Sequence, residues 1–308
     1  MACLVLAVIV LMVVFVAVRA WPTLQHNGIV QWLGPGGSTD KQVGGMVSTT
    51  RHPPAAVYHL RAWPLLYGTL LVGITAVAIG LVFALLCAIF IVEFAPPALR
   101  RVTIPVVRLL AAVPSVVFGL IGVLVLVPFV GNHVISAHQK QSVQYVVQLT
   151  GASLLVAVVV LCVMVTPIMI AMIVDALNAI PRGWSEGAAA LGANRWEAVW
   201  GVSVRAARPA IVAAAVLACA RALGEAVMIA MVAGGRAWAP NFLDGFTALF
   251  EPVNTLASSI VGQSEAITSP AIRSTLYAFA LLLLFSSLVL SVAGYLAKLP
   301  PRRQGMRV

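Results

Sequence analysis

Residues 186–192 read Glu-Gly-Ala-Ala-Ala-Leu-Gly and stand in a polar gap between two long apolar segments, 151–176 and 210–233. A helical membrane protein has little reason to place a small, alanine-rich helix there unless another protein docks on it. Glu186 favours the positive end of a helix dipole, and Gly192 is typical of the break that follows a helix. The stretch therefore predicts a short docking helix between two membrane spans.

The composition around this stretch is that of an integral helical membrane protein. Of 308 residues, 61% are hydrophobic and 9% are charged, a balance that no soluble domain could bury. A membrane span takes about 20 apolar residues, because the hydrocarbon core is about 30 Å thick. Segments long enough to span are residues 2–19, 65–92, 104–130, 151–176, 210–233 and 274–297. The sequence therefore predicts an all-α protein with six spans.

We divide the chain into three parts. Residues 1–63 hold the first span and a long polar loop, and residues 64–300 hold five spans with the docking loop at 178–208. A basic tail, 301–308, follows. The apolar stretch Phe242 to Phe250, in the last loop before the sixth span, is too short to cross a membrane. We expect it to form a re-entrant or interfacial piece.

The basic residues predict the orientation. Ten of the 19 Lys and Arg residues lie in short segments on the side of the docking loop, among them Arg100, Arg101 and Arg195. This positive-inside bias places the docking loop and, with an even number of spans, both termini in the cytoplasm. The first span alone has the opposite bias, since Arg19 follows it and no basic residue precedes it. We expect the later spans to set the topology, or the natural start to lie upstream of Met1.

The docking loop carries further local patterns. Ser185 is expected to cap the short helix, with Glu186 in its first turn. Residues 194–197, Asn-Arg-Trp-Glu, have the pattern of a capping box that opens a second helix. Trp196 and Trp200 stand four apart, on one face of that helix. The prediction is helix, tight turn, helix; the alternative is an ordinary amphipathic loop.

The third predicted span contains a proline and two glycines. Pro114 inside a span would free a backbone carbonyl and kink the helix. Gly119 and Gly122 would allow a neighbouring backbone to approach closely. The alternative for the glycines is helix packing without any further role.

The fifth predicted span contains two charges, Arg221 and Glu225. Residues four apart on a helix face the same way, and charges at membrane depth are costly. In the functional interpretation, Arg221 meets an anionic substrate and Glu225 balances its charge, because a guanidinium fork matches the oxygens of an oxyanion. In the structural alternative, the two form an internal ion pair or lie near the membrane boundary.

Together these strings resemble the permease subunits of ABC importers, and within them the PstC-type phosphate permeases. The stretch 186–192, followed by Pro209, is similar to the EAA loop of that family, although Val204-Arg205 stands where the family has Leu-Pro. Residues 110–122 and 221–225 are similar to the third-span and fifth-span signatures of phosphate permeases. Further matching strings are residues 67–70, 88–96 and 251–256. The resemblance covers span two through span six.

The resemblance implies a type I ABC-importer permease fold whose cytoplasmic coupling helix fits a groove on an ATPase. Glu186, Ala188, Ala189 and Gly192 would then serve ATPase coupling. Arg221, with Glu225 as its partner, would lie on the substrate path for phosphate. The expected assembly, in the bacterial plasma (inner) membrane, is a heterodimer with a PstA-type permease, a PstB-type ATPase dimer and a PstS-type phosphate-binding protein.

Other function classes lack the residues that they need. The sequence has no Gly-x-x-x-x-Gly-Lys-Ser/Thr loop, so we expect ATP hydrolysis on a partner and no enzymatic activity here. It predicts no cofactor and no metal site. It also predicts no binding of nucleic acid, because the basic residues form no stripe. Two alternatives stay open. One is a permease for another oxyanion such as sulfate or molybdate, and the other is a membrane scaffold or sensor that transports nothing.

Overall fold

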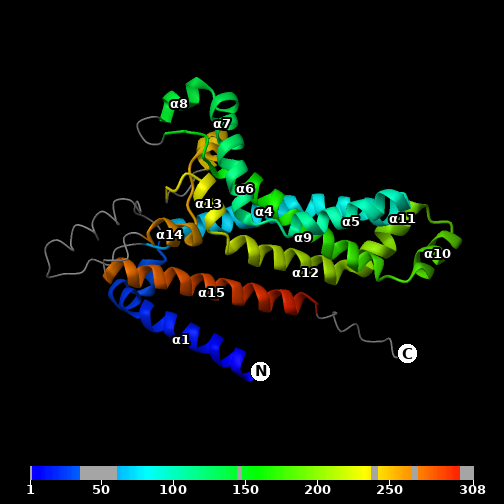
Figure 1. Ribbon diagram of the computed structural model, residues 1–308, viewed down its shortest axis with the longest axis horizontal. Helices are drawn as coiled ribbons and strands as arrows, with labels where there is room; N and C mark the ends of the chain where they lie inside the picture. The colour runs from blue at the N-terminus through cyan, green and yellow to red at the C-terminus, as the bar shows by residue number, and fades with distance from the viewer. Residues whose placement is uncertain (1, 35–60, 144–147, 237–241, 265–269, 299–308) are drawn as a thin grey trace. The chain divides into compact units, whose positions relative to one another are not determined.

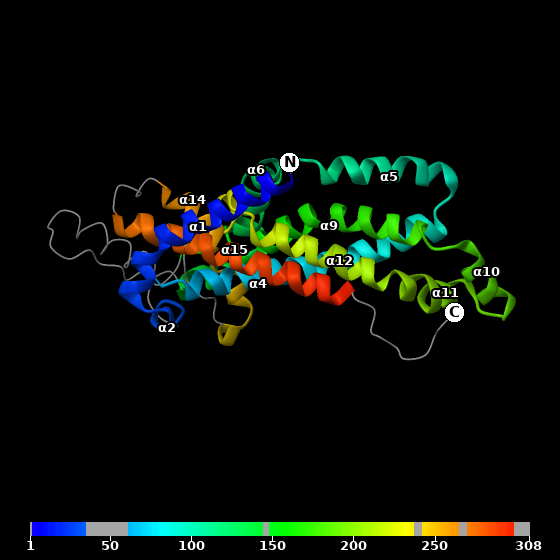
Figure 2. The same cartoon turned by 90° about the horizontal axis from the view of Figure 1, so that it is seen from below.

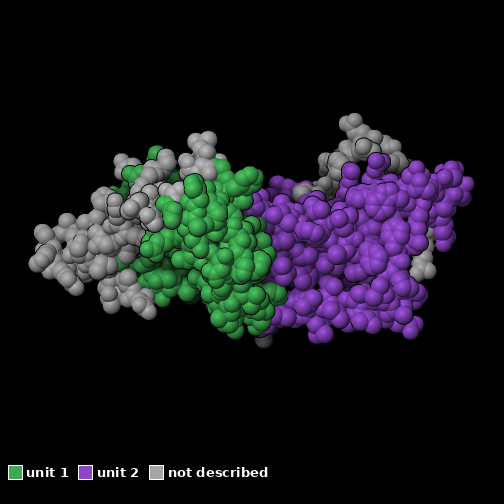
Figure 3. Space-filling model, turned by 90° about the horizontal axis from the view of Figure 1, so that it is seen from above, with its two compact units in different colours: residues 1–73, 115–160, 223–287 green, residues 74–114, 161–222, 288–308 purple. Residues whose placement is uncertain are grey.

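The computed structural model describes residues 2–34, 61–143, 148–236, 242–264 and 270–298. The loop stretch 35–60 and the basic tail 301–308 lie outside the described residues. The chain forms two compact units, coloured separately in Figure 3. Unit 1 comprises residues 1–73, 115–160 and 223–287, and unit 2 comprises residues 74–114, 161–222 and 288–308.

Unit 1 contains the first span, the third span and the segments between the fifth and sixth spans; Figure 1 labels their helices. Its complete helices are α1 (Ala2–Asn27), α2 (Ile29–Trp32), α6 (Ser115–Ile121), α7 (Val127–Phe129), α8 (Ala137–Val143), α13 (Val227–Val232) and α14 (Leu256–Gly262). It also contains the π-helical turns η2 (Gly122–Leu126) and η3 (Val130–Val134), and the 3-10 segment η5 (Phe242–Phe250). Three longer helices begin in unit 1 and end in unit 2: α4 (Trp63–Ile89), α9 (Leu154–Asn178) and α15 (Pro270–Lys298).

Unit 2 contains the docking loop and the segments around it (Figure 2). Its elements are η1 (Phe90–Phe94), α5 (Pro97–Ala111), α10 (Arg182–Ala190), α11 (Arg195–Ala198), η4 (Val199–Ser203) and nearly all of α12 (Val204–Leu223). Here η1 and η4 are π-helical turns that continue neighbouring α-helices.

The described residues contain six helices long and apolar enough to cross a membrane, which agrees with the number expected from the sequence. Their bounds are Cys3–Asn27, Trp63–Phe94, Ser115–Val134, Leu154–Asn178, Arg195–Leu223 and Pro270–Leu296. Four agree with the expected segments apart from their ends. The third and fifth differ.

The third span begins at Ser115, not at residue 104. The residues before it form α5, whose 15 residues are about 22 Å long and too short to cross a bilayer. None of them is buried, and α5 carries Arg100, Arg101 and Arg108. Pro114 precedes the first helical residue of the span, so the prediction that it kinks a span from within is wrong. A proline restricts the residue before it and donates no N–H, and therefore separates the two helices.

The fifth span also differs, because it starts at Arg195 and ends at Leu223 instead of covering 210–233. Three residues, Gly224 to Ala226, separate it from α13. Arg221 lies in the last turn of α12, and Glu225 lies beyond the helix end. The argument that the two residues share a helix face is therefore wrong. Gly224 weakens the helix, and the Glu225 carboxylate accepts a hydrogen bond from the Met228 N–H at 3.3 Å, which opens the next helix instead.

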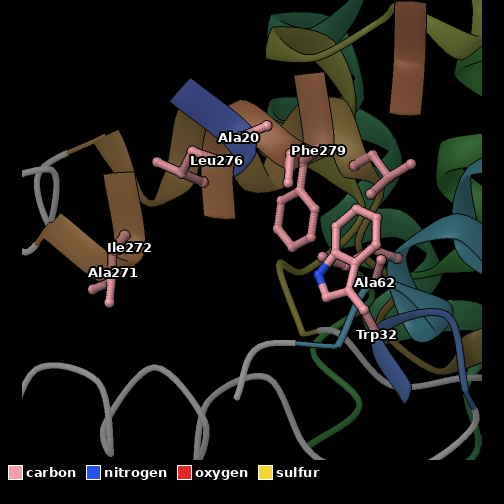
Figure 4. Close-up of a cluster of buried hydrophobic side chains, with 10 residues drawn as sticks. Ala20, Trp32, Ala62, Ala271, Ile272, Leu276 and Phe279 are labelled. Carbon is pink, nitrogen blue, oxygen red and sulfur yellow. The ribbon is translucent and has the colours of Figure 1, made fainter. Parts of the chain in front are cut away.

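The buried core of unit 1 joins α1, α2 and α15 (Figure 4). Trp32 stacks on Phe279 with ring centroids 5.9 Å apart and planes inclined by 19°. Small residues such as Ala20 and Ala62 let the backbones approach this ring pair. Elsewhere α1 is exposed: only 6% of its most hydrophobic 18-residue segment is buried. A helix that is apolar all round and so little covered suits lipid as its surroundings.

Candidate functional site

The docking loop forms the helix, turn and helix expected from the sequence. Its first helix, α10, begins after Pro181, and no side chain caps it. Ser185 lies inside the helix, so its prediction as the N-cap is wrong; Pro181 occupies the N-cap position, with φ −59° and ψ 128°. Glu186 is exposed near the middle of α10, so its prediction in the first turn, at the positive end of the helix dipole, is also wrong.

The turn that ends α10 is a Schellman motif built on Gly192. The Ala193 N–H donates to the Ala188 carbonyl at 3.1 Å, and the Gly192 N–H donates to the Ala189 carbonyl at 3.0 Å. Gly192 has φ +89°, which residues with a side chain rarely adopt. The predicted helix break at Gly192 is therefore present, and it directs the chain into the next helix.

The second helix opens with the predicted capping box. The Asn194 side chain accepts from the Glu197 N–H at 2.9 Å, and the Glu197 carboxylate accepts from the Asn194 N–H at 2.8 Å. This helix continues without interruption from α11 through η4 into α12. Trp196 and Trp200 contact each other edge to face, with ring centroids 5.7 Å apart. The second helix of the docking loop is thus continuous with the helix of the fifth span.

The surface of α10 is unusually bare. Trp184 is 57% exposed and Leu191 is 91% exposed, although both are large apolar residues. Ala189 is exposed and Ala188 is half-buried, and a side chain added at Gly187 would meet nothing within 4 Å. A small, apolar and unobstructed helix surface has the properties of a docking site for another protein.

A cavity of about 320 Å³ lies beside α10 within unit 2. Its lining includes Glu93, Arg100, Asn178, Glu186, Arg195 and Ser203. The expected coupling residue Glu186 and Glu93, at the end of the second span, therefore line the same cavity. Among the described residues, no group of three His, Cys, Asp or Glu side chains could hold a metal ion.

Glu93 ties the second span to the docking loop, a role that sequence reasoning missed. The Arg195 guanidinium donates to the Glu93 backbone carbonyl, and the Ser203 hydroxyl donates to the Glu93 carboxylate at 3.4 Å. The Arg195 guanidinium also lies 4.8 Å from the centre of the Phe94 ring. The partners Arg195 and Ser203 stand 102 and 110 positions away from Glu93 in the sequence.

The amphipathic helix α5 is fastened to α9 by two polar contacts, also unforeseen from the sequence. Arg108 forms an ion pair with Asp175 at 2.9 Å, and Arg100 donates a hydrogen bond to the Asn178 side chain. Figure 2 shows α5 as a separate rod beside α9. Both acceptors lie near the end of α9 that leads into α10.

The break in the fifth span brings α13 against the third span. Gly119 and Gly122 are buried, and a Cβ on Gly122 would lie 2.6 Å from a methyl carbon of Val232. A Cβ on Gly119 would lie 3.1 Å from the Met228 Cα. Close approach of the third span to α13 thus needs glycine at both positions. Of the two predicted substrate-path residues, Arg221 is exposed and Glu225 is half-buried.

A buried polar cluster in unit 1 joins the last loop to the start of the second span. The Thr255 side chain accepts from the Ser258 N–H, the two hydroxyls lie 2.8 Å apart, and this capping box opens α14. The Leu256 N–H donates to the Thr69 hydroxyl at 2.9 Å. Thr69 and Leu256 belong to the matching strings 67–70 and 251–256, and only the fold brings these two strings together. The apolar stretch 242–250 leads into this cluster as η5, interrupted at Gly245.

Comparison with known proteins gives matches over most of the chain. The family model described as "Binding-protein-dependent transport system inner membrane component" matches residues 80–304. The probable phosphate transport system permease protein PstC of Methanocaldococcus jannaschii is 30% identical, over 94% of this chain and 89% of its own length. Phosphate transport system permease protein PstC 1 of Mycobacterium tuberculosis is 32% identical, over 90% and 83%. The probable ABC transporter permease protein YqgH of Bacillus subtilis is 35% identical, over 73% and 67%.

Two solved structures have a similar fold. An inward-facing MetNI methionine ABC transporter matches with a TM-score of 0.50 and 20% identity, over 77% of this chain and 93% of the matched chain. A bacterial ABC transporter involved in the import of the acidic polysaccharide alginate matches with a TM-score of 0.53 and 15% identity, over 84% and 87%. At these identities the likeness concerns the fold alone.

Proposed function

Because this chain belongs to the family of binding-protein-dependent transport system inner membrane components, we propose that it is the PstC-type permease subunit of an ATP-driven phosphate importer. The observation that carries the substrate is the similarity to proteins named as phosphate permeases, over 94% and 90% of the chain. The six helices of the described residues that are long and apolar enough to cross a membrane support a multi-pass membrane subunit. Hydrolysis of ATP belongs to a partner.

The partners that we propose follow from the same family. They are a PstA-type permease that completes the translocation path, a PstB-type ATPase dimer, and a PstS-type phosphate-binding protein on the outer side. We place α10 and both termini in the cytoplasm, since α5 and the docking loop carry clustered arginines. The bare surface of α10, with Glu186, Ala188 and Ala189, then faces the ATPase together with the turn at Gly192.

Coupling would proceed through the helix that follows α10. From Arg195 to Leu223 the chain is helical for 29 residues, or about 43 Å, which exceeds the about 30 Å of a bilayer core. The capping box and the Schellman turn fix its start against α10. A displacement of α10 by the ATPase would then be transmitted along one continuous helix, which contains the π-helical turn η4 and Pro209, to Arg221 in its last turn.

Arg221 is proposed to contact phosphate during translocation. Its guanidinium carries a permanent charge and presents a planar set of donors to an oxyanion. Glu225, beyond the helix end, accepts the Met228 N–H and so holds the start of α13 in place. We propose that the break between α12 and α13, Gly224 to Ala226, supplies the local freedom that alternating access needs. A single exposed arginine binds weakly, which suits a site that must also release its ligand.

The test is phosphate uptake by cells that lack their own high-affinity system and express this chain with its partners. Arg221→Ala should reduce uptake at least about tenfold, the loss typical of one charge-assisted hydrogen bond. Arg221→Lys should recover only part, because lysine lacks the fork. The matched control is Arg101→Ala, which removes an exposed arginine of α5 outside the docking loop. Co-purification of the ATPase reports assembly.

Each outcome separates the alternatives. Intact assembly with uptake lost only in the Arg221 variants supports the proposed substrate path. Normal uptake by Arg221→Ala would remove Arg221 from that path. Wild-type transport of sulfate or molybdate in place of phosphate would favour a permease for another oxyanion. Assembly without transport of any oxyanion would leave the scaffold or sensor.

A further inference from the structure

A basic cleft lies in unit 1, between α1 and the first turns of α15. Figure 1 shows these two segments approaching each other. The cleft has a volume of about 230 Å³ and plays no part in the coupling or translocation proposed above. It is lined by Val18, Arg19, Pro22, Pro270, Arg273, Ser274 and Tyr277. Among the described residues, the lining thus offers two guanidinium groups and two hydroxyls, and it contains no carboxylate.

The walls of the cleft are held in place by buried contacts. The Thr23 hydroxyl lies 2.8 Å from the Ser274 hydroxyl and 3.3 Å from the Thr275 hydroxyl, and all three residues are buried. Phe15 packs edge to face on Tyr277, with ring centroids 5.9 Å apart. The two helices are therefore fastened together directly beside the cleft, which makes it a preorganised cavity.

The two guanidinium groups have no anionic partner in the part of the chain that the structure describes. Arg19 lies 5.5 Å from the centre of the Phe15 ring, and both arginines are exposed. Two like charges that line one cleft without a counter-ion repel each other, and an anion between them would remove that repulsion. A phosphate group suits the pair because guanidinium forks bind its oxygens in a bidentate manner.

The surroundings of the cleft indicate where such a group would come from. Val18 is 66% exposed and Phe15 is 48% exposed, on a helix whose apolar surface is almost entirely uncovered. In a protein with six spans, the end of the first span and the start of the sixth reach the same side of the membrane. Arginines at such a span end lie at the level of the lipid headgroups.

We infer that the cleft between α1 and α15 binds a phosphate group through Arg19 and Arg273, and that its lipid-facing flank favours the phosphodiester of an anionic lipid. Free inorganic phosphate shares the same chemistry and is the other source. In either case the ligand screens the two charges and joins α1 to α15. The inference does not depend on the substrate proposed above, because it concerns binding and not uptake.

The test uses the full chain, purified with its co-expressed partners and reconstituted in nanodiscs of phosphatidylglycerol and phosphatidylcholine. Native mass spectrometry measures which lipid stays bound after release. Equilibrium dialysis in detergent without lipid measures binding of radiolabelled inorganic phosphate. The variants are Arg19→Gln, Arg273→Gln and the double variant. Arg236→Gln is the matched control, since Arg236 is an exposed arginine of the same unit outside the cleft.

We expect selective retention of phosphatidylglycerol by the wild type, reduced about fivefold by each single substitution and about thirtyfold by both, from the usual attraction of one arginine to an anionic membrane surface. Arg236→Gln should behave as the wild type. Saturable binding of inorganic phosphate that is lost in the same variants would assign the cleft to free phosphate. Equal retention of both lipids, with no arginine-dependent phosphate binding, would overturn the inference. The single variants remove only exposed charge, so they keep the test valid if the double variant fails to fold.

Discussion

Gly192→Ala tests whether the turn after α10 holds the docking loop in the geometry that a partner ATPase binds. Gly192 has φ +89°, and a Cβ there would meet nothing within 4 Å. The substitution therefore causes no clash, and its whole cost is backbone strain. For an alanine in the left-handed region that strain is about 1–2 kcal/mol. Such a cost lowers the population of the observed turn about fivefold to thirtyfold.

The expected result is a weaker apparent affinity of the purified chain for its ATPase, by up to that factor, with little change in the unfolding temperature of the spans. Binding can be followed by titrating labelled ATPase against the chain in nanodiscs. Gly192→Asn should be milder than Gly192→Ala, because asparagine enters the left-handed region more readily. Gly201→Ala is the control: it also meets nothing within 4 Å, but it lies in the helix η4 and needs no positive φ.

An affinity of Gly192→Ala equal to that of the wild type would refute the reasoning. The Schellman turn would then be irrelevant to docking, even though it is present in the structure. A loss in Gly201→Ala as large as that in Gly192→Ala would also count against it, because the effect would not follow the backbone angle.

Three further substitutions probe contacts elsewhere. Gly122→Ala should destabilise the chain by about 1–3 kcal/mol in a thermal unfolding assay, because its Cβ would lie 2.6 Å from a Val232 methyl carbon. Adding Val232→Ala to the same chain should recover part of that loss. Asn194→Ala should weaken the start of α11 by about 1 kcal/mol, seen as faster proteolysis of the loop than in the wild type; identical cleavage rates would contradict the capping role. Asp175→Asn should change the free energy of unfolding by less than about 1 kcal/mol, because the side chains of Asp175 and its partner Arg108 are 60% and 57% exposed. A larger loss in thermal unfolding would mean that the ion pair is more strongly coupled than its exposure indicates.

The features that could be predicted from sequence depend on residues close together in the chain. The apolar runs identify the spans, because crossing the bilayer requires a minimum length of apolar helix. The capping box at Asn194 and the break at Gly192 involve partners within five positions. The Trp196 and Trp200 contact follows from helical periodicity alone.

The errors arose where local patterns were ambiguous. An apolar run continues across Pro114, so hydropathy predicts one span from the second half of α5 onward, although the arginines of α5 indicate an amphipathic surface helix. The run from 210 to 233 was likewise assumed to be unbroken, although Gly224 lies within it. Hydropathy measures the apolar content of a segment and does not detect a break between two short helices.

By itself, the sequence determined the membrane class, the number of spans, and the local form of the docking loop, because each depends on the composition or spacing of neighbouring residues. Only the tertiary structure decided which distant segments meet: Glu93 with Ser203, Thr69 with Leu256, and Thr23 with Ser274. These partners are 110, 187 and 251 positions apart. No local pattern encodes such a pairing, because it follows from how the helices pack, and packing depends on the shapes of all their surfaces at once.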